Sequence, residues 1–259
     1  MSVILRCDNF DIQQIAESGQ CFRIENITLN TWQVMAFDRA LVVVKKQNNE
    51  HEFQCSQDEF THIWRDYFDL DADYGSITKL VRNDAYLTAA VNYGNGIRIL
   101  KQDLWETIIS FVISQQNNIS RIKSLISKLC APYGLHFPTA AEILHYSVED
   151  LQCLGFGYRA QYIHQISQAV YSGDFDLLKL QNMSYQTAIS YLLKLHGVGI
   201  KVANCIALFA LHKTEAFPID VWIKRIIDTH YNGKFNYLSF GQNAGIIQQY
   251  MYFYERRLL

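Results

Sequence analysis

The spacing of apolar residues changes near residue 80 of the chain. Before that point, short runs either alternate apolar and polar residues or are rich in β-branched side chains, with turn residues between them: Trp32 to Ala36, Leu41 to Val44, Asn48-Asn49 and Glu52 to Cys55. A period of two is typical of strands with one buried face. Residues 1–80 are therefore predicted to form an antiparallel meander.

After residue 80, apolar residues recur every three to four positions, which is typical of amphipathic helices. Three predicted helix starts carry an N-capping side chain, at Asp103, Asn118 and Thr139. Glu106 and Glu142 follow the first and the third cap at the position of a capping box. Further helices are predicted at 158–171 before Gly173, 184–195, 201–211, 222–231 and 244–256.

These patterns predict an α+β fold with two parts. An N-terminal antiparallel sheet domain covers residues 1–80, and a mainly α-helical core covers residues 81–259. No linker rich in Pro, Gly or Ser separates them, so we expect the two parts to pack together.

The composition indicates a globular protein. Of 259 residues, 49% are hydrophobic and 19% charged, and the 3 prolines and 13 glycines exclude disordered and collagen-like chains. The longest apolar stretch is about that of residues 205–211, far short of the ~20 residues of a membrane helix. The first ten residues lack the core of a signal peptide. We expect a soluble, cytoplasmic protein that does not bind membranes.

Cysteine spacing and net charge limit the kinds of cofactor and binding partner that we expect. The six cysteines form neither a CxxC pair nor a close cluster, so disulfide, zinc and iron-sulfur frameworks are not expected. The net charge of -2 argues against a strongly cationic nucleic-acid binder. However, residues 1–100 carry 9 basic and 14 acidic side chains, whereas residues 101–259 carry 14 and 11. Any anion-binding face should therefore lie in the second part.

A tight turn between two predicted helices carries the first functional signal. Gly197 and Gly199 lie two residues apart between the helical patterns, within a helix-hairpin-helix over about 184–211. Glycine allows a phosphate to approach the backbone, and the amides at the start of the second helix can bind it. Taken alone, the motif is also compatible with an ordinary interhelical turn.

Lys201 lies at the start of the second helix of this hairpin. The helix dipole and partial burial disfavour its ammonium form, which makes it a candidate amine nucleophile as well as a possible surface lysine. Cys205 lies one turn later on the same face. Asp220 follows the extended Phe217-Pro218 segment and is predicted to be an N-cap whose second carboxylate oxygen is free to face Lys201.

With these residues in place, the chain resembles the helix-hairpin-helix DNA glycosylases, and among them the 8-oxoguanine DNA glycosylases. The resemblance spans residues 18 to about 252. The segments that carry it, besides the hairpin and Asp220, are Ser18-Gly19-Gln20-Cys21-Phe22-Arg23, Tyr67-Phe68-Asp69-Leu70-Asp71, Ser114-Gln115-Gln116-Asn117-Asn118-Ile119-Ser120-Arg121-Ile122 and Gly155-Phe156-Gly157-Tyr158-Arg159-Ala160.

The resemblance implies a bifunctional DNA glycosylase and AP lyase that excises 8-oxoguanine from duplex DNA in base excision repair. Lys201 would form a Schiff base with C1′, and Asp220 would stabilise the developing charge. The extruded base would lie between Cys205 and Tyr252. Gly19 would offer its carbonyl to N7, because 8-oxoguanine carries a hydrogen there and guanine a lone pair. Gln248, one turn before Tyr252, would meet the Watson-Crick edge.

The resemblance also assigns residues to the gap that the extruded base leaves. Tyr158 would wedge into it, and Arg121 and Arg159 would donate to the estranged cytosine, with Gln116 and Asn117 in the same DNA-facing segment. The family usually has Asn where Gln116 stands, Phe where Tyr252 stands and His where Trp222 stands.

The implied cofactors and partners are few. No cofactor would be required, although the backbone carbonyls of Leu193, Leu195 and Val198 would hold a monovalent or similar cation against a DNA phosphate. The partner would be double-stranded DNA containing 8-oxoguanine, bound by a monomer.

The sequence motifs are also compatible with two other functions. One is a glycosylase of the same superfamily that acts on a different lesion. The other is a non-catalytic helix-hairpin-helix DNA-binding protein, which would leave Lys201, Asp220 and the Gly19 segment without a common role.

Overall fold

The computed structural model describes residues 1–257 and contains a five-stranded antiparallel sheet in the order β1-β5-β4-β3-β2. The strands are β1 (Val3–Arg6), β2 (Ile24–Thr28), β3 (Thr31–Ala36), β4 (Arg39–Lys45) and β5 (Glu50–Phe53). The alternation in β3 is as predicted, since Trp32, Val34 and Ala36 are buried. Asn48 and Asn49 both have a φ of 59°, and they form the predicted turn between β4 and β5.

The N-terminal part also contains short helices that the sequence pattern does not predict. They are α1 (Ile12–Glu17), α2 (Gln57–Glu59), α3 (Arg65–Tyr67) and α4 (Ile77–Val81), with a π-helical turn over Phe60–Trp64 between α2 and α3. A buried aromatic cluster that includes Phe10, Phe53, Trp64 and Phe68 packs α1, the π-helical turn and α3 against the sheet, whereas Ile77 and Val81 of α4 belong to the core of the helical part.

The remaining chain is mainly helical, as predicted. Its helices are α5 (Ala85–Gly94), α6 (Leu104–Ser114), α7 (Ile119–Cys130), α8 (Ala140–Ile143), α9 (Val148–Cys153), α10 (Arg159–Ser172), α11 (Leu177–Gln181), α12 (Tyr185–Leu192), α13 (Ile200–Phe209), α14 (Val221–Tyr231) and α15 (Ala244–Arg257).

The predicted caps form, with one difference. Asp103, Asn118 and Thr139 each accept a hydrogen bond from the amide three residues later, and Thr139 and Glu142 complete a capping box. Glu106 does not turn back to the Asp103 amide. Its carboxylate is buried and accepts a hydrogen bond from Arg23 instead.

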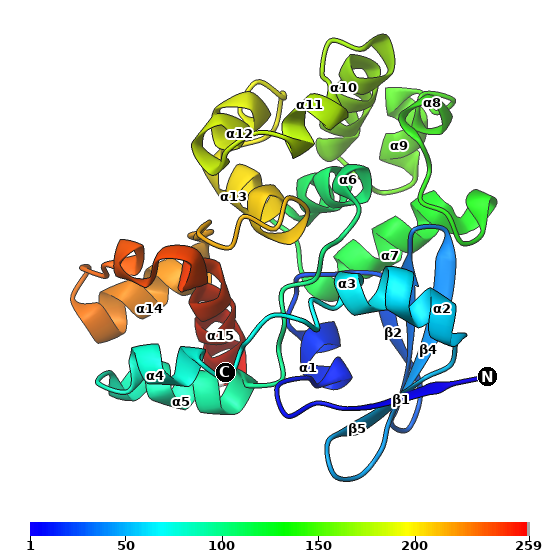
Figure 1. Ribbon diagram of the computed structural model, residues 1–259. Coiled ribbons are helices and arrows are strands. Elements are labelled where there is room, and N and C mark those ends of the chain that lie inside the picture. Colours follow the sequence, from blue (N-terminus) through cyan, green and yellow to red (C-terminus); the bar gives the residue numbers. More distant parts are fainter. Residues whose placement is uncertain (258–259) are drawn as a thin grey trace.

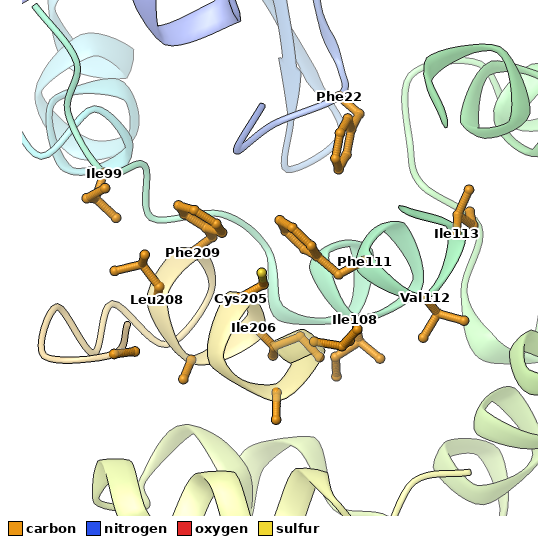
Figure 2. Close-up of a cluster of buried hydrophobic side chains, with 14 of the residues drawn as sticks. Phe22, Ile99, Ile108, Phe111, Val112, Ile113, Cys205, Ile206, Leu208 and Phe209 are labelled. Atoms are coloured by element: carbon orange, nitrogen blue, oxygen red, sulfur yellow. The ribbon is translucent and has the colours of Figure 1, made fainter. Parts of the chain in front are cut away.

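Outside the sheet, most helices form two groups (Figure 1). Helices α8 to α12 lie together on one side of α6 and α13, while α4 and α5 lie beside α14 and α15. Helix α5 thus packs against the C-terminal helix α15, and α4 packs against α5. Figure 2 shows the interior between α6 and α13, where Phe111 and Phe209 stack with their centroids 5.4 Å apart and Cys205 lies beside them.

Arg98 ties the Tyr67 to Asp71 segment to the rest of the fold. Its side chain is 1% exposed and donates hydrogen bonds to the carbonyls of Asn9, Phe68, Asp69 and Ala72. No helix within residues 1–257 is both long and apolar enough to cross a membrane.

Candidate active site

The hairpin between α12 and α13 forms the tight turn that its two glycines predict. Gly197 has a φ of +85°, and a Cβ there would lie 2.4 Å from the Tyr162 ring. A Cβ on Gly199 would meet nothing within 4 Å, so the backbone at the start of α13 is open to a ligand. The Leu195 carbonyl accepts a hydrogen bond from the Val198 amide at 3.1 Å.

Lys201 is the second residue of α13, and its surroundings differ from the expectation. Its Nζ lies 5.6 Å from the centroid of the Phe111 ring. The pKa of Lys201 is raised, first by Cys205 and further by Asp220, although burial acts in the opposite direction. The expected lowering of this pKa is therefore wrong for the DNA-free protein, and the amine must lose a proton before it can attack a carbon.

Asp220 caps α14 through one of its two carboxylate oxygens. Oδ1 accepts hydrogen bonds from the amides of Trp222 at 3.0 Å and Ile223 at 2.9 Å. Oδ2 takes part in neither bond and remains available, as the sequence predicts. Burial raises the pKa of Asp220, against the effect of the cap amides and of Lys201. One residue thus shapes the backbone and offers a carboxylate to the site.

Lys201 and Asp220 meet in a cavity of about 600 Å³, whose wall also includes Gly19, Gln116, Asn117, Trp222 and Tyr252. An adjoining recess of about 50 Å³ is lined by residues that include Lys201, Asp220, Gly19, Cys205, Gln248 and Tyr252. The structure therefore brings both predicted catalytic residues together with all four predicted base-pocket residues. A recess of this size holds a few water molecules, so a purine enters it only if side chains move.

Gly19 and Gln248 are suited to hydrogen bonding with a ligand in the recess. Gly19 has a φ of +76°, and a Cβ there would lie 3.2 Å from the Tyr252 ring. Gln248 is 4% exposed, and its buried Oε1 has no hydrogen-bond partner among residues 1–257. Buried amide oxygens are normally paired, so a ligand that donates a hydrogen bond would satisfy this one.

The residues predicted to face the gap left by the extruded base also lie together, around the turn between α6 and α7, which we call the gap turn. Gln116 in this turn has a φ of +46°. The Arg159 guanidinium is buried and donates to the carbonyls of Gln115 at 2.8 Å and Gln116 at 3.0 Å. Tyr158 is 46% exposed, and the Arg159 guanidinium lies 4.5 Å from its ring centroid. Without DNA, Arg159 thus holds the turn in place.

The other two gap residues are held by backbone carbonyls at the same edge. Arg121 donates to the Gly155 carbonyl at 3.3 Å. Asn117 donates to the Ile113 carbonyl at 3.3 Å and accepts from the Asn118 amide at 3.1 Å. Arg121 is exposed and Asn117 lies at the cavity wall, so both side chains are accessible from outside the fold.

Several contacts that position the site have no signal in the sequence, although the residues that make them do. Gln115 donates to the Gly197 carbonyl at 2.9 Å and so connects the gap turn to the hairpin. Arg23 and Glu106 form a buried ion pair at 3.0 Å, which joins the segment that follows Gly19 to α6. Burial raises the pKa of Glu106 to about 7, although Arg23 acts in the opposite direction. Each partner lies far from the other in the chain, so only the fold reveals the contact.

Metal-ligating side chains are not clustered in the described part of the chain. Within residues 1–257, no group of three or more His, Cys, Asp or Glu side chains is arranged to hold a metal ion. All six cysteines are free.

Comparisons with known proteins agree with this geometry. Residues 2–108 match the family described as 8-oxoguanine DNA glycosylase, N-terminal domain, and residues 109–236 match the HhH-GPD superfamily of base excision DNA repair proteins. The N-glycosylase/DNA lyase of Saccharomyces cerevisiae is 32% identical over 256 residues, an overlap that covers 85% of this chain and 68% of the yeast protein.

Two solved structures share the fold over almost the whole chain. MBOgg1 in complex with a low-affinity DNA ligand has a TM-score of 0.93 at 36% identity, covering 99% of this chain and 96% of that one. The 8-oxoguanine glycosylase/lyase of Clostridium acetobutylicum, bound to double-stranded DNA with cytosine opposite 8-oxoG, has a TM-score of 0.92 at 32% identity, with the same coverage of 99% and 96%. The chain therefore belongs to the 8-oxoguanine DNA glycosylase family, within the HhH-GPD superfamily of base excision repair proteins.

Proposed function

We propose that this protein is a bifunctional DNA glycosylase and AP lyase that excises 8-oxoguanine from duplex DNA in base excision repair. The observation that carries the proposal is the single cavity in which Lys201 and Asp220 adjoin a recess lined by Gly19, Cys205, Gln248 and Tyr252. The names and activities of the relatives support the same reaction.

Recognition of the base would use the recess. The base leaves the stack, because chemistry at its sugar is not accessible inside the duplex. Cys205 and Tyr252 contact its two faces, the Gly19 carbonyl accepts from N7-H, and Gln248 meets the Watson-Crick edge. Normal guanine would present a lone pair to the Gly19 carbonyl and would be repelled.

Cleavage would use Lys201 and Asp220. The bond from C1′ to N9 breaks, the base leaves with the bonding electrons and takes up a proton, and the deprotonated Lys201 amine forms a bond to C1′. The Asp220 carboxylate stabilises the positive charge that develops on the sugar. Opening of the sugar ring gives an imine, which acidifies the C2′ hydrogen. Loss of that proton expels the 3′ phosphate by β-elimination, and water then releases the amine.

Contacts to DNA would come from the gap turn and the hairpin. Tyr158 would fill the gap, and Arg121, Arg159, Gln116 and Asn117 would face the estranged base. Phosphate would bind at Gly197 and Gly199. The carbonyls of Leu193, Leu195 and Val198 would hold a monovalent or similar cation there, which requires Leu195 to share its carbonyl with the Val198 amide.

The oligomeric state and the cellular location follow from the same expectations. The protein would act as a monomer on lesion-containing duplex DNA, without a required cofactor or an iron-sulfur cluster, in the cytoplasm and at the nucleoid in a prokaryotic cell. A glycosylase for a different lesion is the alternative, and cleavage of duplexes with 8-oxoguanine opposite each of the four bases distinguishes the two.

The catalytic assignment is tested by borohydride trapping and strand nicking on 8-oxoguanine duplexes. Lys201→Gln should abolish both, because it removes the proposed nucleophile. Lys234→Gln, at an exposed lysine outside the cavity wall, should change neither. Asp220→Asn should slow base release while lesion binding persists and the melting temperature falls little, since Asn also caps helices. Trapping that persists in Lys201→Gln would assign the nucleophile to another residue.

A further inference from the structure

The turn from Ser18 to Gln20 is held by glutamine side chains from two separate parts of the chain. Gln249 in α15 donates from Nε2 to the Ser18 carbonyl at 2.5 Å. Gln102, in the segment before α6, donates from Nε2 to the Gln20 carbonyl at 2.8 Å. The carbonyls before and after that of Gly19 are therefore both fixed in direction.

The Gly19 carbonyl lies between these two anchored carbonyls and has no such partner. It accepts no hydrogen bond from any residue in the range 1–257. Ser18 and Gln20 are both 0% exposed, whereas Gly19 lies at the wall of the cavity. Of the three carbonyls in this turn, that of Gly19 is thus the one without a donor among residues 1–257, and Gly19 lines the recess.

Gln249 is also next to Gln248 on the same helix. It is 2% exposed, so its bond to Ser18 lies in a low-dielectric interior, where a lost hydrogen bond leaves the Ser18 carbonyl unpaired. Gln248, Gln249 and Tyr252 all line the recess from α15, and the Nε2 atom of Gln249 is the one engaged by the Ser18 carbonyl. The Gln249 bond therefore fixes the distance between the Gly19 turn and the helix that carries the rest of the base pocket.

We propose that Gln249 is a positioning residue for lesion discrimination, which acts by fixing the direction of the Gly19 carbonyl. This inference rests on the proposed function. A fixed carbonyl attracts N7-H of 8-oxoguanine and repels the N7 lone pair of guanine, whereas a mobile carbonyl turns away from the lone pair and reduces the repulsion. Gln249 thus governs the choice of base and leaves the chemistry at the sugar unaffected.

The test measures two quantities: the ratio of Kd values for guanine and 8-oxoguanine duplexes, and the rate of strand cleavage at an abasic site. Gln249→Met keeps the length of the side chain and removes its donor. In a Lys201→Gln background, which prevents cleavage, the ratio of Kd values for guanine and 8-oxoguanine duplexes should fall about tenfold, the factor for one well-placed hydrogen bond. With Lys201 present, strand cleavage at an abasic site should be unchanged, because no base occupies the recess.

Two further variants separate positioning from stability. Gln102→Met, which loosens the same turn from the other side, should lower the Kd ratio in the same way. Gln14→Met is the matched control, since Gln14 bridges α1 to the Tyr93 carbonyl at 3.1 Å and the Gly96 amide at 2.9 Å, outside the cavity wall. It should lower the melting temperature and leave the Kd ratio unchanged.

The outcomes distinguish this inference from the proposed function. A Lys201→Gln parent that does not prefer 8-oxoguanine to guanine would refute the proposed function, and this inference with it. A parent that has the preference, and keeps it in both Gln249→Met and Gln102→Met, would refute this inference alone. Equal losses of lesion preference and abasic-site cleavage in Gln249→Met would show that Gln249 is merely structural.

Discussion

Replacing Glu106 with glutamine removes a buried charge but keeps an oxygen that can accept from Arg23. The two side chains form an ion pair at 3.0 Å and are 12% and 4% exposed. Burial raises the pKa of Glu106 from 4.5 to about 7. Because the folded-state value lies above the unfolded one, the stability contribution is full below pH 4.5 and is lost as pH rises through about 7. The difference corresponds to about 3 kcal/mol of unfolding free energy.

Thermal melting of wild type and Glu106→Gln between about pH 5 and about pH 8 measures this effect. Wild type should lose about 3 kcal/mol relative to the variant over that range, or roughly 6 to 12 °C in Tm. Glu142→Gln is the control. The Thr139 backbone amide lowers the pKa of Glu142, so its contribution is lost only as pH falls below 4.5, and its curve should parallel that of wild type.

Parallel curves for wild type and Glu106→Gln would contradict this expectation. Such curves would show that Glu106 stays ionised throughout, with Arg23 compensating fully for desolvation.

Two other substitutions test the DNA-facing parts. Gln116→Asn should sharpen selectivity for cytosine opposite the lesion, by about 1 to 3 kcal/mol for each base contact that is restored. Single-turnover cleavage of four duplexes that differ only in the base opposite the lesion measures this selectivity. Equal selectivity in wild type and variant would mean that Arg121 and Arg159 alone determine it. Gly197→Ala should lower the free energy of unfolding by about 1 to 3 kcal/mol, because it combines an unfavourable φ with a clash against Tyr162. Denaturant unfolding measures the second change, and an unchanged midpoint would contradict it.

Local interactions are what the sequence predicts well. The caps at Asp103, Asn118, Thr139 and Asp220 depend on a side chain and an amide two or three residues away, and all of them form. Helices α1 to α4 are six residues or shorter, so they contain too few turns for a period to be recognised.

The site is only partly predictable for the same reason. The spacing of Lys201 and Cys205 on one helix face is a local property, whereas Gly19 and Gln248 enter through the resemblance of whole segments to a family. The pKa of Lys201 depends on Cys205 and on Asp220, which lies 19 positions further along the chain, and the sequence-based expectation missed their combined effect. Contacts such as Arg23 with Glu106 become visible only in the fold.

The hydrogen bond from Gln249 to Ser18 spans 231 positions of the chain. During synthesis, the helices that hold Lys201 and Asp220 leave the ribosome before α15 does, and contacts of such high sequence separation close late because loop-closure entropy opposes them. The hairpin that carries Lys201 can therefore form in the growing chain before α15 has completed the base recess. Since the cavity and the recess are both lined by Gly19 from the N-terminal part and by Tyr252 from α15, the order of synthesis completes base recognition after the hairpin has formed.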